Sequence, residues 1–394
     1  MKDNHFSYKT QNRKSVVHRN SNDAGEISAK GLLEYDHRRG GFLRQLSINM
    51  ETQHSDPHVS SHLIQRWKLR DASVLECAAK RGHHGSEVTD IHKINELDAD
   101  TWVNIEEFSR RTAVDPTERI KLTTSPSNVS MRVVDLLCPI GKGQRALIVA
   151  PPRSGKTVLM QQFAASISEN HPEIDLMVLL VDERPEEVTD MRRTIRGKVF
   201  ASSSDSDRES HVRLARLVLE YAKRKAETGK DVVLLLDSLT KMGRAFNAVQ
   251  RGSGKTMSGG VDSRALEIPK RIFGAARALE GGGSLTIIAT ALVETNSRMD
   301  ELIFQEFKGT GNMELVLNRD LANERIFPAI NIPESGTRRE ELLFGRETLK
   351  YQELRRLVHR MKPKEAILTL LKAMGKYPTN RKLLSRLTGE KADV

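Results

Sequence analysis

The sequence predicts an α/β fold with a parallel sheet covered by helices on both faces, preceded by a small β-rich domain. Four apolar runs, residues 145–150, 175–182, 231–237 and 284–292, alternate with stretches of helical spacing. Continuous apolar strands that alternate with helices are typical of a parallel sheet buried on both faces. Residues 31–122 instead hold short runs between turn-forming residues, as a small β domain does.

The composition indicates a soluble protein of two or three domains. The chain has 394 residues, of which 38% are apolar and 29% charged, and such a length exceeds one ordinary module. The formal charge of +11 favours an anionic partner such as nucleic acid, although a basic solvated surface gives the same balance. Cys77 and Cys138 are too few for a disulfide framework and favour the cytoplasm. The apolar runs are too short to span a membrane, and no signal core begins the chain.

The elements follow in order along the chain. Residues 1–30 are basic and poor in large apolar side chains, which predicts a disordered arm. The β-rich domain is expected over residues 31–122, and the Ser-, Thr- and Pro-rich stretch 123–130 reads as a linker. Residues 131–394 form the α/β domain, which ends in helices past about residue 345.

The stretch "APPRSGKT", residues 150–157, ends as a phosphate-binding loop does, although Ala150 replaces the usual first glycine. An apolar strand precedes it and a helix follows, which is the setting that such a loop needs. Gly155 lets backbone N–H groups approach phosphates, Lys156 supplies a positive charge, and Thr157 offers a hydroxyl to Mg²⁺. A chance match is the alternative. The similar "GSGKT" at 252–256 follows no apolar strand, so we reject it as a nucleotide site.

Further charged residues stand where phosphate chemistry needs them. Asp237 ends one apolar strand and is placed to hold Mg²⁺ through water, while Glu183 ends another and is placed to polarise an attacking water. Arg338 and Arg339 follow a flexible turn and can neutralise a transferring phosphate, often in a neighbouring subunit. Each residue alone also fits a turn, a cap or a salt-bridged helix start. Together with the loop they indicate hydrolysis of a nucleoside triphosphate.

These motifs give the chain a resemblance to the Rho family of bacterial transcription termination factors. It rests on "APPRSGKT", "VLLVDERPEEVTDM", "LLLDSLTKMGRAFN", "GGVDSRALEIPKRIFGAARALEGGG", "EFKGTGNMELVLNR" and "SGTRREELL". In this family the loop itself begins Ala-Pro-Pro, so Ala150 follows the family pattern. The resemblance implies a RecA-like P-loop domain, preceded by an OB- or cold-shock-like RNA-binding domain, in an RNA-dependent ATPase and helicase.

The resemblance also implies a role for individual residues. Glu183 would be the catalytic base, Lys156 would contact phosphate, Thr157 and Asp237 would serve Mg²⁺ (Asp237 through water), and Arg338 would act across a subunit interface. The residues that would line ATP are Gly141, Lys142, Gly143, Gln144, Arg145, Ala146, Arg153, Ser154, Gly155, Lys156, Thr157, Val158, Arg184 and Phe327. Those that would contact RNA are Phe42, Arg44, Lys255, Thr256, Met257, Ser258, Gly259, Gly260 and Arg298.

The chain departs from the family pattern at a few positions. Lys241 stands where the family usually has arginine, which keeps the charge but loses the bidentate fork. In the N-terminal domain Gly40 replaces an aromatic residue, and His58 and Val88 occupy places where the family usually has tyrosine. Bases of a single strand stack on such aromatics, so fewer of them predict weaker primary RNA binding.

The function expected from the sequence is termination of transcription by a homo-hexameric ring. ATP and Mg²⁺ would drive its 5′-to-3′ movement on single-stranded nascent RNA and release the transcript from RNA polymerase. One alternative is an RNA-binding regulatory ring with an altered primary site and weak termination activity. Another is a RecA-like ATPase that acts on DNA or protein.

Overall fold

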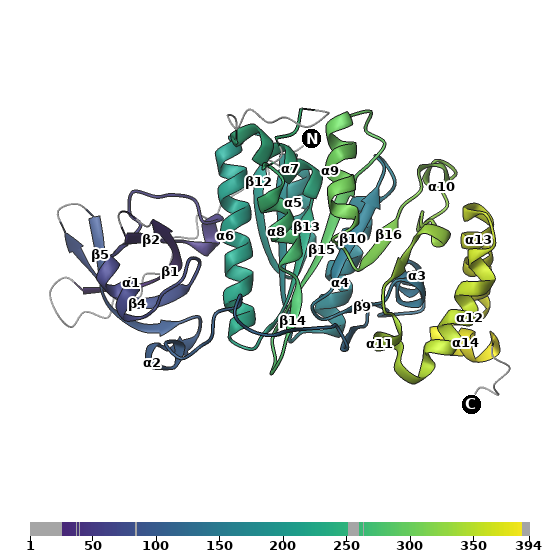
Figure 1. The fold of residues 1–394 in the computed structure, drawn as a ribbon, viewed down its shortest axis with the longest axis horizontal. Helices are drawn as coiled ribbons and strands as arrows, with labels where there is room; N and C mark the ends of the chain where they lie inside the picture. The colour runs from purple at the N-terminus through teal and green to yellow at the C-terminus, as the bar shows by residue number, and fades with distance from the viewer. Residues whose placement is uncertain are drawn as a thin grey trace, which may run out of the picture. The chain divides into compact units, whose positions relative to one another are not determined.

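The computed structural model describes residues 26–36, 38, 40–82, 85–250, 260–262 and 264–387. The chain divides into two compact units, residues 1–103 and 104–394 (Figure 1). Most of the arm expected over residues 1–30 lies outside the described residues. Its last five residues, 26–30, are instead the start of a strand, because they pair with residues 76–80 of the same unit.

The N-terminal unit is a small closed β-sheet. Its strands are β1 (Glu26–Asp36), β2 (Gly40–Arg44), β3 (His58–Val59), β4 (Val74–Gly82), β5 (Gly85–Ile94) and β6 (Leu97–Asp98). They follow the order β3-β2-β1-β4-β5-β6, and β3 also pairs with β5, which closes the sheet into a barrel. The short helices η1 (Leu46–Ile48), α1 (Ser61–Arg66) and α2 (Ala99–Trp102) complete the unit. This architecture confirms the predicted OB-like domain.

The interior of the N-terminal unit is filled by apolar side chains from its strands and from α2. Leu32, Leu33, Leu75, Ile94 and Trp102 are all completely buried. Burial of large apolar side chains is the main favourable term that a small unit of this kind has. Val88 belongs to the same interior, since only 3% of it is exposed.

The second unit is built on a mostly parallel sheet, as the four apolar runs predict. The parallel strands are β10 (Arg145–Ala150), β11 (Asp175–Glu183), β12 (Lys198–Ser203), β13 (Asp231–Asp237), β15 (Ser284–Leu292) and β16 (Met313–Val316). Their order is β12-β11-β13-β15-β10-β16, and the short β17 (Gly336–Thr337) joins β16 in the antiparallel sense. The strand β14 (Arg277–Leu279) pairs antiparallel with β15 and with β7 (Ala113–Val114).

Helices cover both faces of this sheet (Figure 1). On one face α4 (Lys156–Asn170) and α5 (Pro185–Thr194) share a core with inward side chains of β10, β11 and β13, together with α3 (Val129–Leu137). On the other face α6 (Arg208–Glu227), α7 (Leu239–Val249) and α9 (Arg298–Lys308) pack on the sheet, and α8 (Glu267–Gly274) packs on α7. The sheet is therefore buried on both sides, and its residues read as continuous apolar runs for that reason.

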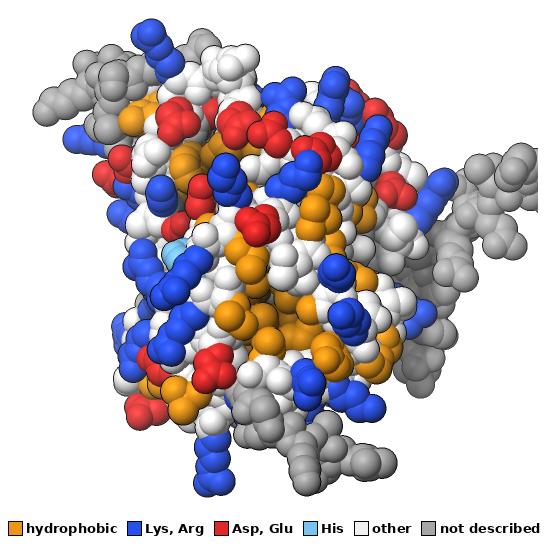
Figure 2. Space-filling view, turned by 90° about the vertical axis from the view of Figure 1, so that its right-hand side faces the viewer, with side chains coloured by type: hydrophobic (Ala, Val, Ile, Leu, Met, Phe, Trp, Pro, Cys, Tyr) orange, Lys and Arg blue, Asp and Glu red, His pale blue; other side chains and the backbone are white. Residues whose placement is uncertain are grey.

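The C-terminal part of the second unit is helical, as expected. After α10 (Arg319–Asn323) and η2 (Ile332–Glu334), the chain forms α11 (Glu341–Phe344), η3 (Gly345–Glu347), α12 (Thr348–His359), α13 (Pro363–Lys376) and α14 (Asn380–Leu387). Figure 2 shows the end of the molecule that carries these helices, where apolar side chains gather among Lys and Arg. Exposed leucines on the helices are Leu349, Leu357, Leu368 and Leu387. Gathered apolar surface of this kind is typical of interaction sites.

The boundary between the units lies earlier than the linker expected at 123–130. Residues 113–114 pair with β14, and β8 (Arg119–Ile120) pairs with β9 (Ile140–Gly141), so this segment belongs to the second unit. The buried carboxylate of Asp135 accepts hydrogen bonds from the backbone N–H of Leu122 and from both the N–H and the hydroxyl of Thr123. The stretch resembles a linker in the sequence because it is rich in polar residues. Their hydrogen bonds to buried partners become visible only in the structure. In the part of the chain that the structure describes, no helix meets the length and hydropathy of a membrane span.

Candidate active site

The phosphate-binding loop connects the end of β10 to the first turn of α4. Arg153 and Gly155 have positive φ angles, 64° and 89°. Gly155 is the N-cap residue of α4, and because it has no side chain it makes no capping hydrogen bond to the first turn. Ser154 is buried and donates its hydroxyl to the Pro151 carbonyl at 2.7 Å, which holds the bend. The first N–H groups of a helix have no partner within it, so this end of α4 is suited to bind an anion.

The Lys156 side chain meets the two predicted carboxylates at the carboxyl edge of the sheet. Its Nζ donates to both oxygens of Asp237 at 2.5 Å and lies 3.6 Å from Glu183 Oε1. Thr290 on β15 donates its hydroxyl to Asp237 Oδ1 at 2.7 Å. The structure thus brings together residues at the carboxyl ends of β10, β11, β13 and β15, because parallel strands meet at one edge.

Burial and charge shift the pKa values of this cluster. Burial raises the pKa of Glu183 and the nearby Asp237 carboxylate adds to the rise, while Lys156 and Lys241 oppose it. Burial by itself would lower the pKa of Lys156, but the carboxylates of Asp237 and Glu183 outweigh it, so the pKa is raised. The lysine is therefore held as an ammonium, while Glu183 is a carboxylate made more basic than usual, which suits a general base.

Lys241 is a member of the site that the sequence marks only as a departure from the family pattern. Its Nζ lies 2.7 Å from Glu183 Oε1 and donates to the Asp182 carbonyl at 2.8 Å. The residue sits in the first turn of α7, four positions after Asp237. A cation one helical turn beyond a strand-end carboxylate is the sequence signal that points to this role.

A cavity of about 490 Å³ opens beside the phosphate-binding loop. The residues Arg153 to Val158 line it together with Phe327 and Pro328. The Phe327 ring is half exposed, and its Cε1 lies 3.4 Å from the place that a Cβ on Gly155 would take. The structure therefore brings Phe327 to the loop, with an apolar face available for a nucleotide base.

Residues Gly141 to Ala146 and Arg338 do not lie in this cavity. They are at the amino end of β10, whereas the loop follows its carboxyl end, about 17 Å away at the usual rise of a strand. The backbone N–H of Arg338 donates to the Asn312 carbonyl, and the Gln144 amide and Arg145 N–H donate to the Asn312 side chain. The prediction that residues 141–146 line the same nucleotide as residues 153–158 is thus not met within a single chain, whereas Arg338 is expected to act only across a subunit interface.

The glycine-containing turn at 141–144 has a structural reason for its composition. Gly143 has a φ of 91°, and a Cβ there would lie 2.2 Å from the Ala278 nitrogen. Lys142 forms ion pairs with Glu118 and Asp231. Arg184, by contrast, is exposed at the start of α5, directly after Glu183.

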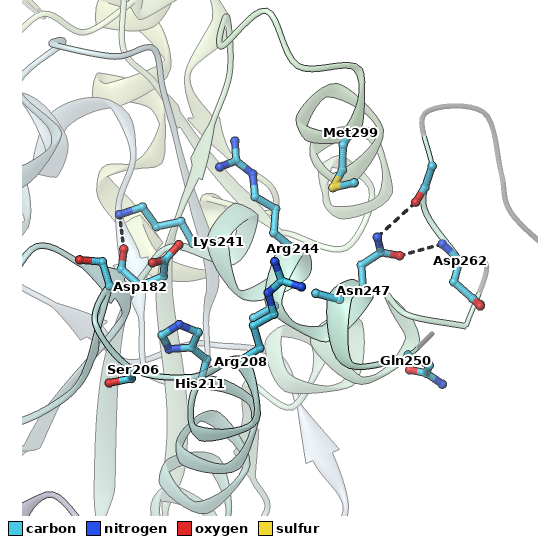
Figure 3. Close-up of a pocket in the computed structure, with 14 residues that line it drawn as sticks. Asp182, Ser206, Arg208, His211, Lys241, Arg244, Asn247, Gln250, Asp262 and Met299 are labelled. Carbon is cyan, nitrogen blue, oxygen red and sulfur yellow. Dashed lines mark hydrogen bonds between the residues drawn. The ribbon is translucent and has the colours of Figure 1, made fainter. Parts of the chain in front are cut away.

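A second cavity, of about 890 Å³, lies on the other side of Lys241 (Figure 3). The cationic side chains Arg208, Lys241 and Arg244 line it, and Gly260, Asp262 and Met299 border it. Of the predicted RNA-binding loop, Lys255, Thr256, Met257, Ser258 and Gly259 lie outside the described residues. The Asn247 side chain donates to the Gly260 carbonyl and accepts from the Asp262 N–H, which fixes the point where the chain leaves that loop.

The start of α9 borders the same cavity. Arg298 is the first residue of the helix and precedes Met299. The buried Asp300 accepts from Arg244 Nε at 2.7 Å and from the Thr295 hydroxyl at 2.6 Å. Of the predicted RNA-contacting positions, Gly260 lines this cavity and Arg298 directly precedes the lining residue Met299, while Lys241 lines the cavity and pairs with Glu183.

The predicted RNA residues of the N-terminal unit lie on neighbouring strands. Phe42 is partly exposed on β2 and stands opposite His58 on β3. Arg44 is mostly covered, because its guanidinium pairs with Glu34 and Asp56, both at 2.6 Å, and lies 5.2 Å from the centre of the Phe42 ring. Phe42 thus offers a ring to a ligand, and Arg44 supports that ring.

Comparisons with known proteins agree with this architecture. Residues 130–337 match the ATP synthase alpha/beta family, nucleotide-binding domain. An ATPase from the type III secretion system of pathogenic bacteria superposes with a TM-score of 0.56 at 25% identity, over 70% of this chain and 80% of that chain. The ATPase EscN of enteropathogenic E. coli has the same fold, with a TM-score of 0.57 over 71% of this chain and 72% of that chain.

Several relatives are similar to this chain over nearly its whole length. Transcription termination factor Rho of Pseudomonas fluorescens biotype C is 48% identical, over 93% of this chain and 89% of the relative. The protein of the same name from Thermotoga maritima is 44% identical, over 96% of this chain and 90% of the relative. With the OB-like barrel, the nucleotide-binding unit and the Lys156–Asp237–Glu183 cluster, these identities show that the chain belongs to the Rho family of transcription termination factors.

Proposed function

We propose that this chain is an RNA-stimulated ATPase that moves 5′ to 3′ on nascent RNA and releases the transcript from RNA polymerase. The observation that carries the proposal is the cluster of Lys156, Asp237 and Glu183, which Lys241 joins to the cavity at the base of the predicted RNA loop. Lys241 would thus contact both the catalytic cluster and RNA bound in the cavity. The buried, reduced thiols Cys77 and Cys138 support a cytoplasmic protein.

The chain's own residues have distinct tasks toward ATP. The N-terminus of α4 and Lys156 bind the phosphates, Phe327 packs against the base, and Glu183 takes a proton from the attacking water. The residues fit a Mg²⁺ ion, because this ion takes one or two carboxylates and otherwise phosphate and water oxygens. Asp237 and the Thr157 hydroxyl would hold it, and it would neutralise charge on the phosphates. Among the described residues, no cluster of three or more His, Cys, Asp or Glu could hold a metal ion.

The position of Arg338 supports a ring in which each nucleotide lies between two subunits. Arg338 is exposed and lies at the opposite end of β10 from its own phosphate-binding loop. Because it cannot reach the phosphates of its own chain, a role in catalysis requires a neighbouring copy. Residues 141–146 lie at the same end, and all of them except the partly buried Arg145 are covered within their own chain. The closed assembly proposed is a homo-hexamer.

Mixing two inactive variants tests this arrangement. Lys156→Ala and Arg338→Ala homo-oligomers are each expected to lose ATP hydrolysis. Mixed oligomers should regain it, because about one quarter of randomly formed interfaces pair an intact loop with an intact arginine. The measurement is the rate of phosphate release after the two variants are unfolded and reassembled together. Arg346→Ala serves as the matched control, since Arg346 is an exposed arginine of η3, and it should keep full activity. Absence of any gain on mixing would contradict catalysis across the interface.

The dependence on RNA is tested on the parent chain. Pyrimidine-rich single-stranded RNA should raise ATP hydrolysis by at least about tenfold, if it neutralises the cationic cavity and so alters Lys241. Hydrolysis should not respond to double-stranded DNA of equal length. The measurement is the steady-state rate of phosphate release against RNA concentration, with Lys156→Ala as the blank. A rate that is indifferent to RNA would contradict the proposal, and equal stimulation by DNA would favour the alternative of a DNA-directed ATPase.

One observation favours the alternative of a regulatory RNA-binding ring. Gly40 has a φ of 89°, and a Cβ there would lie 2.5 Å from the Val59 carbonyl, so this position has no room for an aromatic ring. A weaker primary site would leave hydrolysis intact but lower the efficiency of loading. Binding of short cytidine oligomers in the absence of ATP separates the two, because a regulatory ring would bind RNA without releasing transcripts.

A further inference from the structure

The N-terminal unit carries a ring pair that the proposed function has not yet used. The pairing of β2 with β3 sets Phe42 opposite His58. Their ring centres are 5.3 Å apart with an interplanar angle of 64°, so one ring meets the other edge to face. The His58 side chain is 33% exposed and Phe42 is partly exposed. The pair is therefore accessible to a ligand, and the sheet to which both residues belong holds it in place.

The imidazole holds its place because the neighbouring position has no side chain. A Cβ at Gly40 would lie 3.0 Å from His58 Nε2 as well as 2.5 Å from the Val59 carbonyl. Contacts this short are tighter than ordinary van der Waals packing permits. Gly40 and His58 thus form one arrangement, in which the glycine gives the histidine room and the histidine takes the place of a second apolar ring.

Acidic groups outnumber basic ones around this pair. On β5, Glu87 lies 4.0 Å from His58 Nδ1. Arg44 on β2 lies over the Phe42 ring, but Glu34 on β1 and the buried Asp56 both pair with it. Lys80 on β4 stands opposite Glu87 in the pairing of β4 with β5. Among the described residues, two cations and three carboxylates thus lie around the pair when the imidazole is neutral. A phosphate backbone is repelled by such a balance, and a proton on His58 would reduce the repulsion.

We propose that His58 makes RNA binding by the N-terminal unit depend on protonation. Phe42 stacks on one base. The protonated side chain of His58, which lies beside Glu87, faces the phosphate next to that base. The inference rests on the proposed function, because it takes single-stranded RNA as the ligand. Histidine is the side chain whose charge changes between pH 5 and 8. Since a protonated imidazole attracts phosphate, the affinity for RNA is expected to be higher at about pH 5 than at about pH 8.

The test compares RNA binding by the full chain at two pH values. The probe is a fluorescent cytidine oligomer, with ATP absent, and Kd is measured at about pH 5.5 and about pH 8. The parent should bind up to about tenfold more tightly at the lower pH, because a positive charge then faces the phosphate. The slope of log Kd against log salt should be steeper there by about 0.7, the value for one more phosphate contact in a single strand.

Variants assign the effect to this histidine. His58→Phe keeps a ring and removes the proton, and His58→Asn removes both, so Kd of either variant should change little between the two pH values. His92→Phe is the matched control, because His92 is also exposed and also faces a carboxylate, Asp90, and it should keep the response of the parent. Circular dichroism confirms that each variant is folded, and His58→Asn serves if the larger ring disturbs Gly40.

The outcomes separate the two proposals. If both His58 variants keep the pH response of the parent, or if the parent shows none, the proposal for His58 is wrong while RNA binding stands. If the parent fails to bind the oligomer at either pH and RNA fails to stimulate its hydrolysis, the proposed function itself fails.

Discussion

Replacing Lys156 with alanine is expected to abolish ATP hydrolysis, with a fall in kcat of at least about 100- to 1,000-fold, the usual cost of one charge-stabilising group. The ammonium makes the shortest contacts of the site, at 2.5 Å to both oxygens of Asp237. Its loss removes a phosphate ligand and also leaves Asp237 and Glu183 facing each other without the cation between them. Both the rate of phosphate release and the affinity for nucleotide are expected to fall.

The measurement for Lys156→Ala is the rate of phosphate release at saturating ATP and RNA. Lys372→Ala is the matched control, because Lys372 is an exposed lysine on α13, and its rate should equal that of the parent. A Lys156→Ala chain that is folded and keeps more than about a tenth of the parent rate would show that the loop does not bind the reacting phosphate.

Replacing Glu183 with glutamine is expected to stop hydrolysis while ATP still binds. A general base contributes about 100- to 10,000-fold to a rate, and glutamine cannot accept the proton. Glu183 lies 4% exposed at the end of β11 and is absent from the cavity that the phosphate-binding loop lines. Binding of ATP should therefore change little. The measurement combines kcat from phosphate release with Kd for a fluorescent ATP analogue.

The matched control for this variant is Glu186→Gln, an exposed glutamate in the first turn of α5 that should keep the parent rate. The pH profile gives a second test. Burial and the nearby Asp237 raise the pKa of Glu183 above its ordinary value of 4.5. The base acts deprotonated, so the rate should fall as the pH falls through that raised pKa. A rate that falls only below the ordinary range of carboxyl groups would rule out Glu183 as the base.

The sequence predicts much of this site because its chemistry depends on local spacing. The run 145–150 followed by Gly155, Lys156 and Thr157 defines a strand, a loop and a helix without any distant contact. Asp237 and Glu183 each end an apolar run, and parallel strands bring such ends to one edge. The order of the strands, which sets Thr290 beside Asp237, comes from pairings between segments far apart in the chain.

Other features depend on contacts that the sequence does not display. Residues 104–122 look like part of the β-rich domain, yet their strands pair with the second unit. Residues 141–146 stand a few positions before the phosphate-binding loop in the sequence, but a strand separates the two segments in space. Lys241 reaches Glu183 only because α7 starts beside β11.

By itself, the sequence determined the class of fold, the phosphate-binding loop and its strand-end carboxylates, since each depends on periodicity and short-range spacing. Only the tertiary structure decided the order of the strands, that Arg338 lies away from its own loop, and that Gly40 makes room for His58 beside Phe42. These three depend on the register and direction of strands from distant parts of the chain, and long-range pairing of that kind leaves no local signal.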